Sequence, residues 1–177
     1  MSEKIHKLLD TVYLACIWIS GMSILAMSLI IPWGIFARYV LGTGSSWPEP
    51  LAVLLMVIFT FFGAAATYRA GGHIAVGMLT DRLPSNMQWL CAKLVDLLMM
   101  AVCLFVMIWG SQLSMEMMRQ GLAELPWLPV GYTYLPLPIG SFLTLLFVLE
   151  NTFAGSQANR AVVTFDHETA EVHTEAL

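Results

Sequence analysis

The sequence predicts an all-α integral membrane protein with four transmembrane helices, both termini in the cytoplasm, and a short amphipathic surface segment between the second and third helices. Two observations lead to this class. The chain of 177 residues is 58% hydrophobic and 11% charged, whereas soluble domains carry roughly 25% charged residues. Four stretches also lack any charged residue, and each is long enough for the roughly 20 residues that cross about 30 Å of hydrocarbon. These stretches are residues 11–37, 50–68, 97–115 and 125–149.

The orientation follows from the basic residues between the spans. With four spans, both termini lie on the same side of the membrane. Six Lys and Arg residues fall on that side, and only Arg38 and Arg119 fall on the other; the six are Lys4, Lys7, Arg69, Arg82, Lys93 and Arg160. Because Lys and Arg gather in short cytoplasmic loops, both termini are predicted to be cytoplasmic.

The first two spans are predicted at about residues 11–37 and 50–68. The first would be about 40 Å long as a helix of 1.5 Å per residue, so it must tilt, bend or project, and Pro32 offers a bend. The second span closes with small residues between Gly63 and Thr67. Such residues let another helix approach closely. That helix can belong to this chain or to a partner, and the sequence leaves both readings open.

The third span is predicted at about residues 89–115, after a connection that contains an apolar segment too short to cross the membrane. This segment, which begins at His73, is expected to lie along the membrane surface. Lys93 and Asp96 are three residues apart and therefore share one helical face. At that depth the two side chains can pair or reach the lipid headgroups, which lowers the cost of placing them near lipid.

The fourth span is predicted at about residues 130–150, and Pro136 and Pro138 lie inside it. The two prolines leave the carbonyls of Tyr132 and Tyr134 without their helical partners, which a neighbouring helix or water can replace. Residues 1–154 are thus expected to form the membrane domain. Residues 155–177 are expected to form a flexible, acidic cytoplasmic tail.

Several classes of function are disfavoured by the sequence. The apolar centres of the spans carry no ionisable group, which a self-sufficient ion-coupled transporter would place there. The sequence has no HExxH motif and no glycine-rich phosphate loop, and no basic run suggests nucleic acid. Haem ligation is also disfavoured, because all four histidines are placed outside the spans; they are His6, His73, His167 and His173. We therefore predict no catalytic residue, no metal, no cofactor and no enzyme activity.

Polar residues at the membrane boundaries are the remaining candidates for function. Arg38 ends the first span and Glu49 opens the second on the same side, so the two could form an ion pair that fixes the hairpin. Arg38 could instead extend to water. Trp47 and Glu49 would order the start of the second helix, and Arg69 and His73 would hold the surface segment. All five residues are candidates either for subunit contacts or for the internal structure of the chain.

Short motifs follow one another in order along these four spans. They are RYVLG at residues 38–42, SWPE at 46–49, GHIAV at 72–76, DRLP at 81–84, and YLPLPIG at 134–140 followed by Glu150. In this order they resemble the small membrane subunit of TRAP transporters, the tripartite ATP-independent periplasmic transporters. The resemblance covers roughly residues 7–151.

The resemblance implies a scaffold in the bacterial inner membrane that pairs with a large permease subunit. The large subunit would carry out ion-coupled uptake, with sodium as the expected ion, of an organic acid delivered by a periplasmic binding protein. Membrane lipids would be the remaining partners. Two alternatives stay open: a self-sufficient small oligomeric channel or exporter, and an assembly or sensor protein that acts through the acidic tail. The substrate is not specified by this sequence.

Overall fold

The computed structural model describes residues 3–43, 46–71, 85–122 and 128–154 of the chain. These residues form the helices α1 (Glu3–Tyr39), α2 (Pro48–Arg69), α4 (Ser85–Met117), α5 (Gly131–Tyr134) and α6 (Pro136–Ala154). Four stretches are long and apolar enough to span a membrane: Ile5–Tyr39, Pro48–Arg69, Leu90–Met117 and Gly131–Thr152. The predicted all-α, four-span membrane fold is thereby confirmed. The predicted surface segment and the acidic tail lie outside the described residues.

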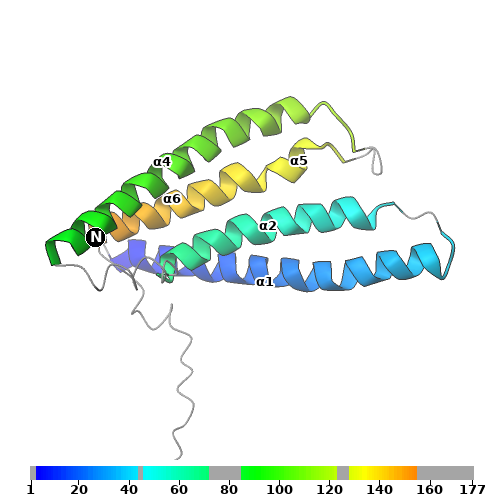
Figure 1. The fold of residues 1–177 in the computed structure, drawn as a ribbon, viewed down its shortest axis with the longest axis horizontal. Helices are drawn as coiled ribbons and strands as arrows, with labels where there is room; N and C mark the ends of the chain where they lie inside the picture. Colours follow the sequence, from blue (N-terminus) through cyan, green and yellow to red (C-terminus); the bar gives the residue numbers. More distant parts are fainter. Residues whose placement is uncertain (1–2, 44–45, 72–84, 123–127, 155–177) are drawn as a thin grey trace, which may run out of the picture.

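The helices lie side by side in a single layer, in the order α1, α2, α6, α4 (Figure 1). Helix α2 packs against both α1 and α6, and α6 packs against both α2 and α4. The four helices converge at the end where α1 begins and α6 ends, which we call the terminal end. Toward the opposite end, the hairpin end, the α1–α2 pair diverges from the pair formed by α4 and α5–α6 (Figure 1).

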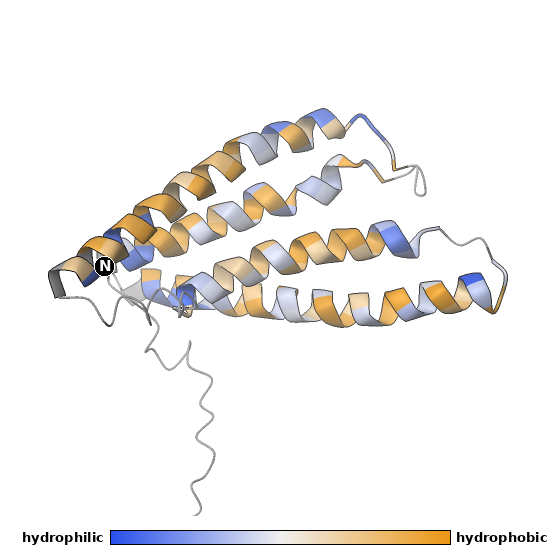
Figure 2. Cartoon of the chain, viewed as in Figure 1, coloured by the Kyte–Doolittle hydropathy of each residue, from blue (hydrophilic) through white to orange (hydrophobic). Residues whose placement is uncertain are grey.

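Helix α1 packs on α2 along one narrow stripe of its surface. The buried positions alternate in steps of four and three: Leu9, Tyr13, Cys16, Ser20 and Ser23. This is the heptad spacing of helices that coil around each other with a left-handed twist. The rest of α1 is largely exposed and apolar, as expected of a surface that faces lipid (Figure 2). Pro32 lies on that exposed surface, and α1 continues through it to Tyr39.

Small residues lie at close approaches between neighbouring helices. A Cβ atom on Gly140 of α6 would lie 2.6 Å from Cβ of Phe61 on α2, and one on Gly63 of α2 would lie 3.0 Å from Oγ of Ser20 on α1. Ala65 and Ala66 are also buried. The small residues at the end of the second span are therefore used for packing within this chain, as one of the two readings predicted. Ala64 and Thr67 remain exposed.

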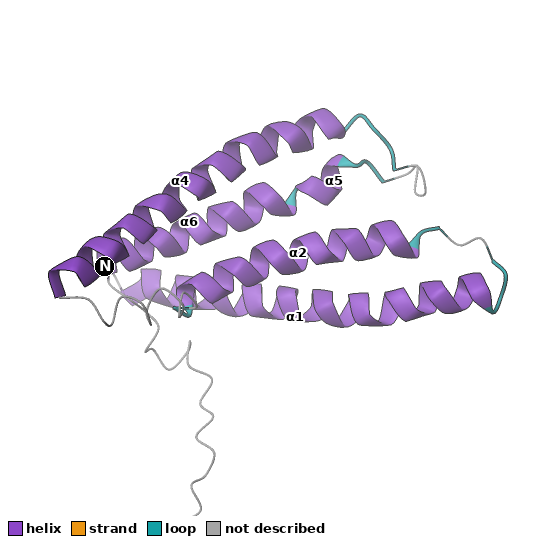
Figure 3. Ribbon diagram, in the orientation of Figure 1, coloured by secondary structure: helices purple, strands orange, loops and turns teal. Residues whose placement is uncertain are grey.

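The fourth span is divided at Leu135, between α5 and α6 (Figure 3). Pro136 and Pro138 account for this division, because neither can donate a backbone hydrogen bond. Helix α4 contacts the backbone just before this division, since Ser114 Oγ donates to Gly131 O at 2.9 Å. That a neighbouring helix or water replaces the partners of the Tyr132 and Tyr134 carbonyls stays a prediction.

Candidate functional site

A buried arginine lies where three helices meet at the terminal end. Arg69 is the last residue of α2, and Glu150 lies near the end of α6. The Arg69 Nε donates to Glu150 Oε2 at 2.7 Å, and Nη2 donates to Glu150 Oε1 at 2.9 Å. Both side chains are 1% exposed. Two parallel hydrogen bonds between ionised groups form the strongest geometry that an arginine and a carboxylate can adopt.

Helix α1 supplies the other partners of this guanidinium. Arg69 Nη2 donates to Asp10 Oδ1 at 2.7 Å, and Nη1 donates to the backbone oxygen of Leu9 at 3.2 Å. The centre of the guanidinium lies 5.4 Å from the Tyr13 ring and 5.3 Å from the Phe147 ring. These distances fall within the range of cation–π attraction. One side chain therefore links α1, α2 and α6.

His6 adds a further contact to Glu150. Its Nδ1 lies 3.3 Å from Glu150 Oε1, one turn of α1 before Asp10. Helix α1 begins at Glu3, well before the predicted span, so His6 lies within the helix. The prediction that every histidine lies outside the spans is therefore wrong for His6. Its place in the first turns of α1, where the helices converge, lets it reach α6.

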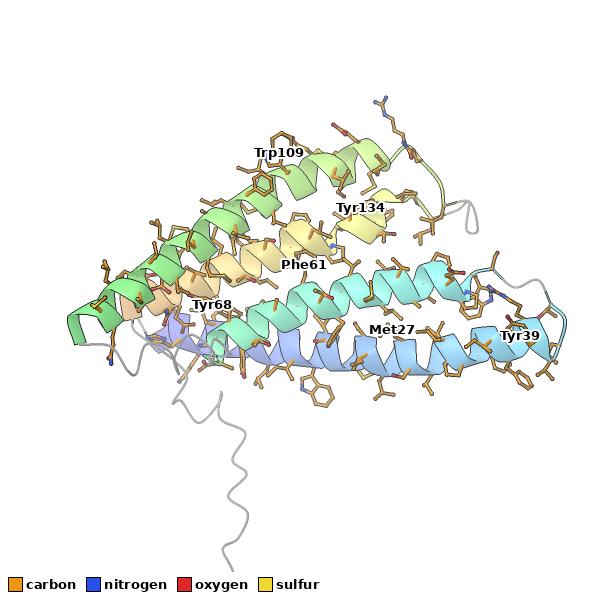
Figure 4. The ribbon with its side chains drawn as sticks, in the orientation of Figure 1. Met27, Tyr39, Phe61, Tyr68, Trp109 and Tyr134 are labelled. Carbon is orange, nitrogen blue, oxygen red and sulfur yellow. The ribbon has the colours of Figure 1, made fainter. Side chains whose placement is uncertain are left out.

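A second polar group joins α4 to the same end of the layer. Asp96 of α4 is buried, and its Oδ1 accepts hydrogen bonds from Tyr68 Oη at 2.9 Å and from Asn151 Nδ2 at 3.0 Å. Figure 4 shows Tyr68 at this end of the layer. The prediction that Asp96 pairs with Lys93 or reaches the headgroups is therefore wrong, because its carboxylate turns inward to neutral donors on α2 and α6.

The two groups adjoin each other, because Tyr68 precedes Arg69 on α2 and Glu150 precedes Asn151 on α6. We call the combined set the terminal-end cluster; it consists of His6, Asp10, Tyr68, Arg69, Asp96, Glu150 and Asn151. Burying polar groups away from water is costly unless each finds a partner. Throughout the described residues, every buried side-chain nitrogen and oxygen has one. The cluster thus joins all four spanning helices at one end.

The hairpin end carries the predicted pair of Arg38 and Glu49. Arg38 Nη2 lies 3.7 Å from Glu49 Oε2, with side chains 55% and 79% exposed. The predicted ion pair is therefore present, although it is longer than a charge-assisted hydrogen bond of about 2.7–2.9 Å. Trp47 precedes α2, and its carbonyl accepts the Leu51 amide at 3.3 Å. A role of Arg38, Trp47 and Glu49 in subunit contacts stays a prediction.

The link after α1 is ordered by a cap. Gly42 adopts φ +64°, a left-handed conformation that glycine accepts readily at the end of a helix. The Thr43 backbone nitrogen and Oγ1 then donate to Ala37 O at 3.1 and 2.9 Å. The end of α1 is therefore fixed independently of the Arg38–Glu49 pair.

Arg69 binds Asp10 and Glu150, two partners that the sequence did not predict. The predicted role of Arg69 in holding the surface segment stays a prediction, because that segment lies outside the described residues. His73 lies outside the described residues, so its role stays a prediction. Asp10, Asp96 and Glu150 each lie at the limit of a charge-free run, but a contact of any of them with Arg69 was not predicted. Their position at span ends on the same predicted side as Arg69 was the signal that they could pair with it.

These observations define a multi-pass membrane protein whose buried charges gather at one end of four packed helices. Comparison with known proteins identifies its family. The family described as tripartite ATP-independent periplasmic transporters, DctQ component, matches residues 27–158. This chain belongs to that family, the small permease subunits of TRAP transporters, and is a protein of the inner membrane.

Two relatives are similar along most of their length. One, from Haemophilus influenzae, is named as a TRAP transporter small permease protein; it is 29% identical over 123 residues, which are 69% of this chain and 76% of the relative. The other is the sialic acid TRAP transporter small permease protein SiaQ of Vibrio cholerae. It is 23% identical over 130 residues, which are 72% of this chain and 73% of the relative.

Proposed function

We propose that this chain is a non-catalytic scaffold that pairs with the large permease subunit of a TRAP transporter. The large subunit carries out sodium-coupled uptake of an organic acid, which a periplasmic binding protein delivers. Family membership supports the transporter context. The name of the Vibrio cholerae relative mentions sialic acid, a carboxylate, which agrees with an organic acid as the class of substrate.

The terminal-end cluster is the observation that carries the scaffold role. A chain that moved ions by itself would direct ionisable groups toward a path through the membrane. Here Arg69, Glu150 and Asp96 are buried among partners on neighbouring helices of the same chain. Buried charged side chains that bind neighbouring helices hold those helices rigidly together. A rigid subunit of this kind can serve as the fixed part against which the transport domain of the large subunit moves.

Affinity purification of the tagged full chain from its native membranes in mild detergent tests this proposal. We expect a large multi-spanning permease to co-purify in stoichiometric amount, and we expect proteoliposomes to accumulate substrate only when they contain both subunits and the binding protein. Recovery of this chain alone in several gentle detergents, together with transport by this chain alone, would instead support a small channel or exporter.

The acidic tail offers a second test of the same proposal. Deletion of residues 155–177 is expected to leave both permease recovery and uptake close to those of the full chain, because the packed helices end at Ala154. A truncated chain that still recovers the permease but abolishes uptake would favour an assembly or sensor role. The matched control is the full chain carrying the same affinity tag at its N-terminus.

A further inference from the structure

An apolar groove runs between α1 and α2 in the half of the layer nearest the hairpin end. It encloses about 420 Å³. Its apolar walls come from both helices, and two charged residues, Arg38 and Glu49, stand at one end of it. The apolar wall residues include Met27, Ile31, Ile35, Val53 and Met56. Figure 4 shows Met27 between the two helices and Tyr39 at the hairpin end, which mark the two limits of the groove.

The groove matches one leaflet of a bilayer in depth. Met27 and Arg38 are separated along α1 by about 16 Å at 1.5 Å per residue. The hydrocarbon of a bilayer is about 30 Å thick, so the groove runs from the end of the span to near the middle of the membrane. Apolar walls at that depth are covered either by lipid acyl chains or by another protein.

The charges at the end of the groove indicate which lipid fits. Arg38 and Glu49 are both largely exposed, and their contact of 3.7 Å leaves room for each to bind a third group more closely. A phosphate is a good ligand for this guanidinium, because its oxygens can accept two parallel hydrogen bonds from it. A primary ammonium beside that phosphate would in turn meet the Glu49 carboxylate.

We propose that this groove binds a phospholipid with an ethanolamine headgroup. An acyl chain lies between α1 and α2, Arg38 binds the phosphate, and Glu49 binds the ammonium. A glycerol headgroup carries no positive charge and would place an anionic phosphate beside Glu49 without compensation. A choline headgroup keeps the positive charge but has no N–H to donate to the carboxylate. This inference concerns the chain alone, so it does not depend on the scaffold role.

Native mass spectrometry of the delipidated full chain tests the proposal with ethanolamine, glycerol and choline phospholipids of identical acyl chains. We expect the ethanolamine lipid to bind most tightly, and Arg38→Ala to weaken its binding roughly tenfold, as loss of a charged hydrogen bond would. Glu49→Gln should remove the preference for ethanolamine over glycerol while leaving a bound lipid. Arg119→Ala is the matched control, because Arg119 is exposed beyond α4 and lies outside the groove.

Filling the groove gives an independent readout that leaves both charges in place. Val53→Trp should weaken binding of all three lipids, because its side chain would occupy the space between α1 and α2. Equal binding of the three lipids by the wild type, or unchanged binding by both Arg38→Ala and Val53→Trp, would overturn the proposal. It would also be overturned if the intact transporter lacked this lipid and Ile35→Cys cross-linked to the permease, since a protein helix would then fill the groove.

Discussion

The two ends of the layer each carry an arginine–glutamate pair, and the two pairs are built in opposite ways. Arg69 and Glu150 are buried and share two hydrogen bonds of 2.7 and 2.9 Å, whereas Arg38 and Glu49 are exposed and approach only to 3.7 Å. Residue type therefore does not decide how much such a pair contributes to the stability of the fold. The number of helices that meet around the pair decides it.

The terminal end supplies many partners because the helices converge there (Figure 1). Arg69 reaches α1 and α6 from its place at the end of α2. At the hairpin end the helix pairs diverge, and among the described residues Arg38 has one acidic neighbour, Glu49, across a short turn. We infer that the terminal end holds the helices together, and that the hairpin end keeps its charges available for other molecules.

Removal of Arg69 should have the largest effect. Arg69→Ala leaves the buried carboxylate of Glu150 without its arginine partner, and breaking a buried pair in this way costs about 3–5 kcal/mol. We expect a loss of that size in the free energy of unfolding, measured by denaturant titration of the purified chain in detergent. Arg119→Ala, on an exposed arginine, should change it by less than about 0.5 kcal/mol. Equal stabilities of the two variants would contradict the comparison.

Neutralising the acidic partner should have a smaller effect than removing the arginine. Glu150→Gln keeps the shape of the side chain, and Arg69 keeps its bond to Asp10. We expect a loss of about 1.5–3 kcal/mol, the usual contribution of hydrogen bonds to charged groups. The same titration checks this, with Glu116→Gln on an exposed glutamate near the end of α4 as the control. A loss as large as that of Arg69→Ala would show that Asp10 contributes little to holding the arginine.

The link to α4 should be weaker still, because it depends on Asp96 and neutral donors. Tyr68→Phe removes the hydroxyl that donates to Asp96, but Asn151 still donates to the same oxygen. We expect a loss of about 0.5–1.5 kcal/mol. In the background of Asp96→Asn the effect of Tyr68→Phe should shrink, since the charged acceptor is gone. If both backgrounds give the same loss, the hydroxyl stabilises the fold through contacts other than Asp96.

The sequence predicted well the features that are local along the chain. The four spans follow from runs without charge, and the Arg38–Glu49 pair follows from two residues that face each other across one short turn. Pro136 and Pro138 predicted missing helical hydrogen bonds in the fourth span, and the structure divides the span beside them, at Leu135, although the division itself was not predicted. None of these predictions required knowledge of which helices are neighbours.

The terminal-end cluster depends on neighbours, and for this reason the sequence did not predict it. Arg69 and Glu150 are 81 residues apart in the chain, and they meet only because α6 lies beside α2. The four spans were predicted, but not the order α1, α2, α6, α4 in the layer. Because buried charges need partners, Asp10, Asp96 and Glu150 were each possible partners of Arg69. The sequence alone does not select among the three.

Removal of the exposed pair should have the smallest effect on stability. Arg38→Ala is expected to change the unfolding free energy by about 0–1 kcal/mol, as for other exposed ion pairs, because the cap at Gly42 and Thr43 fixes the end of α1 without it. Lipid-free detergent is the medium to use, so that lipid binding does not contribute to the measured stability.

A double-mutant cycle of Arg38→Ala with Glu49→Ala then separates the two ends. Its coupling energy should fall as the ionic strength rises from about 0.1 M to about 1 M, since the screening length shortens from about 10 Å to about 3 Å. The corresponding cycle of Arg69→Ala with Glu150→Ala should keep its coupling energy, because both side chains are buried from solvent. If both cycles responded to salt alike, water and ions would reach the terminal-end cluster, and it could not hold the four helices as a rigid unit.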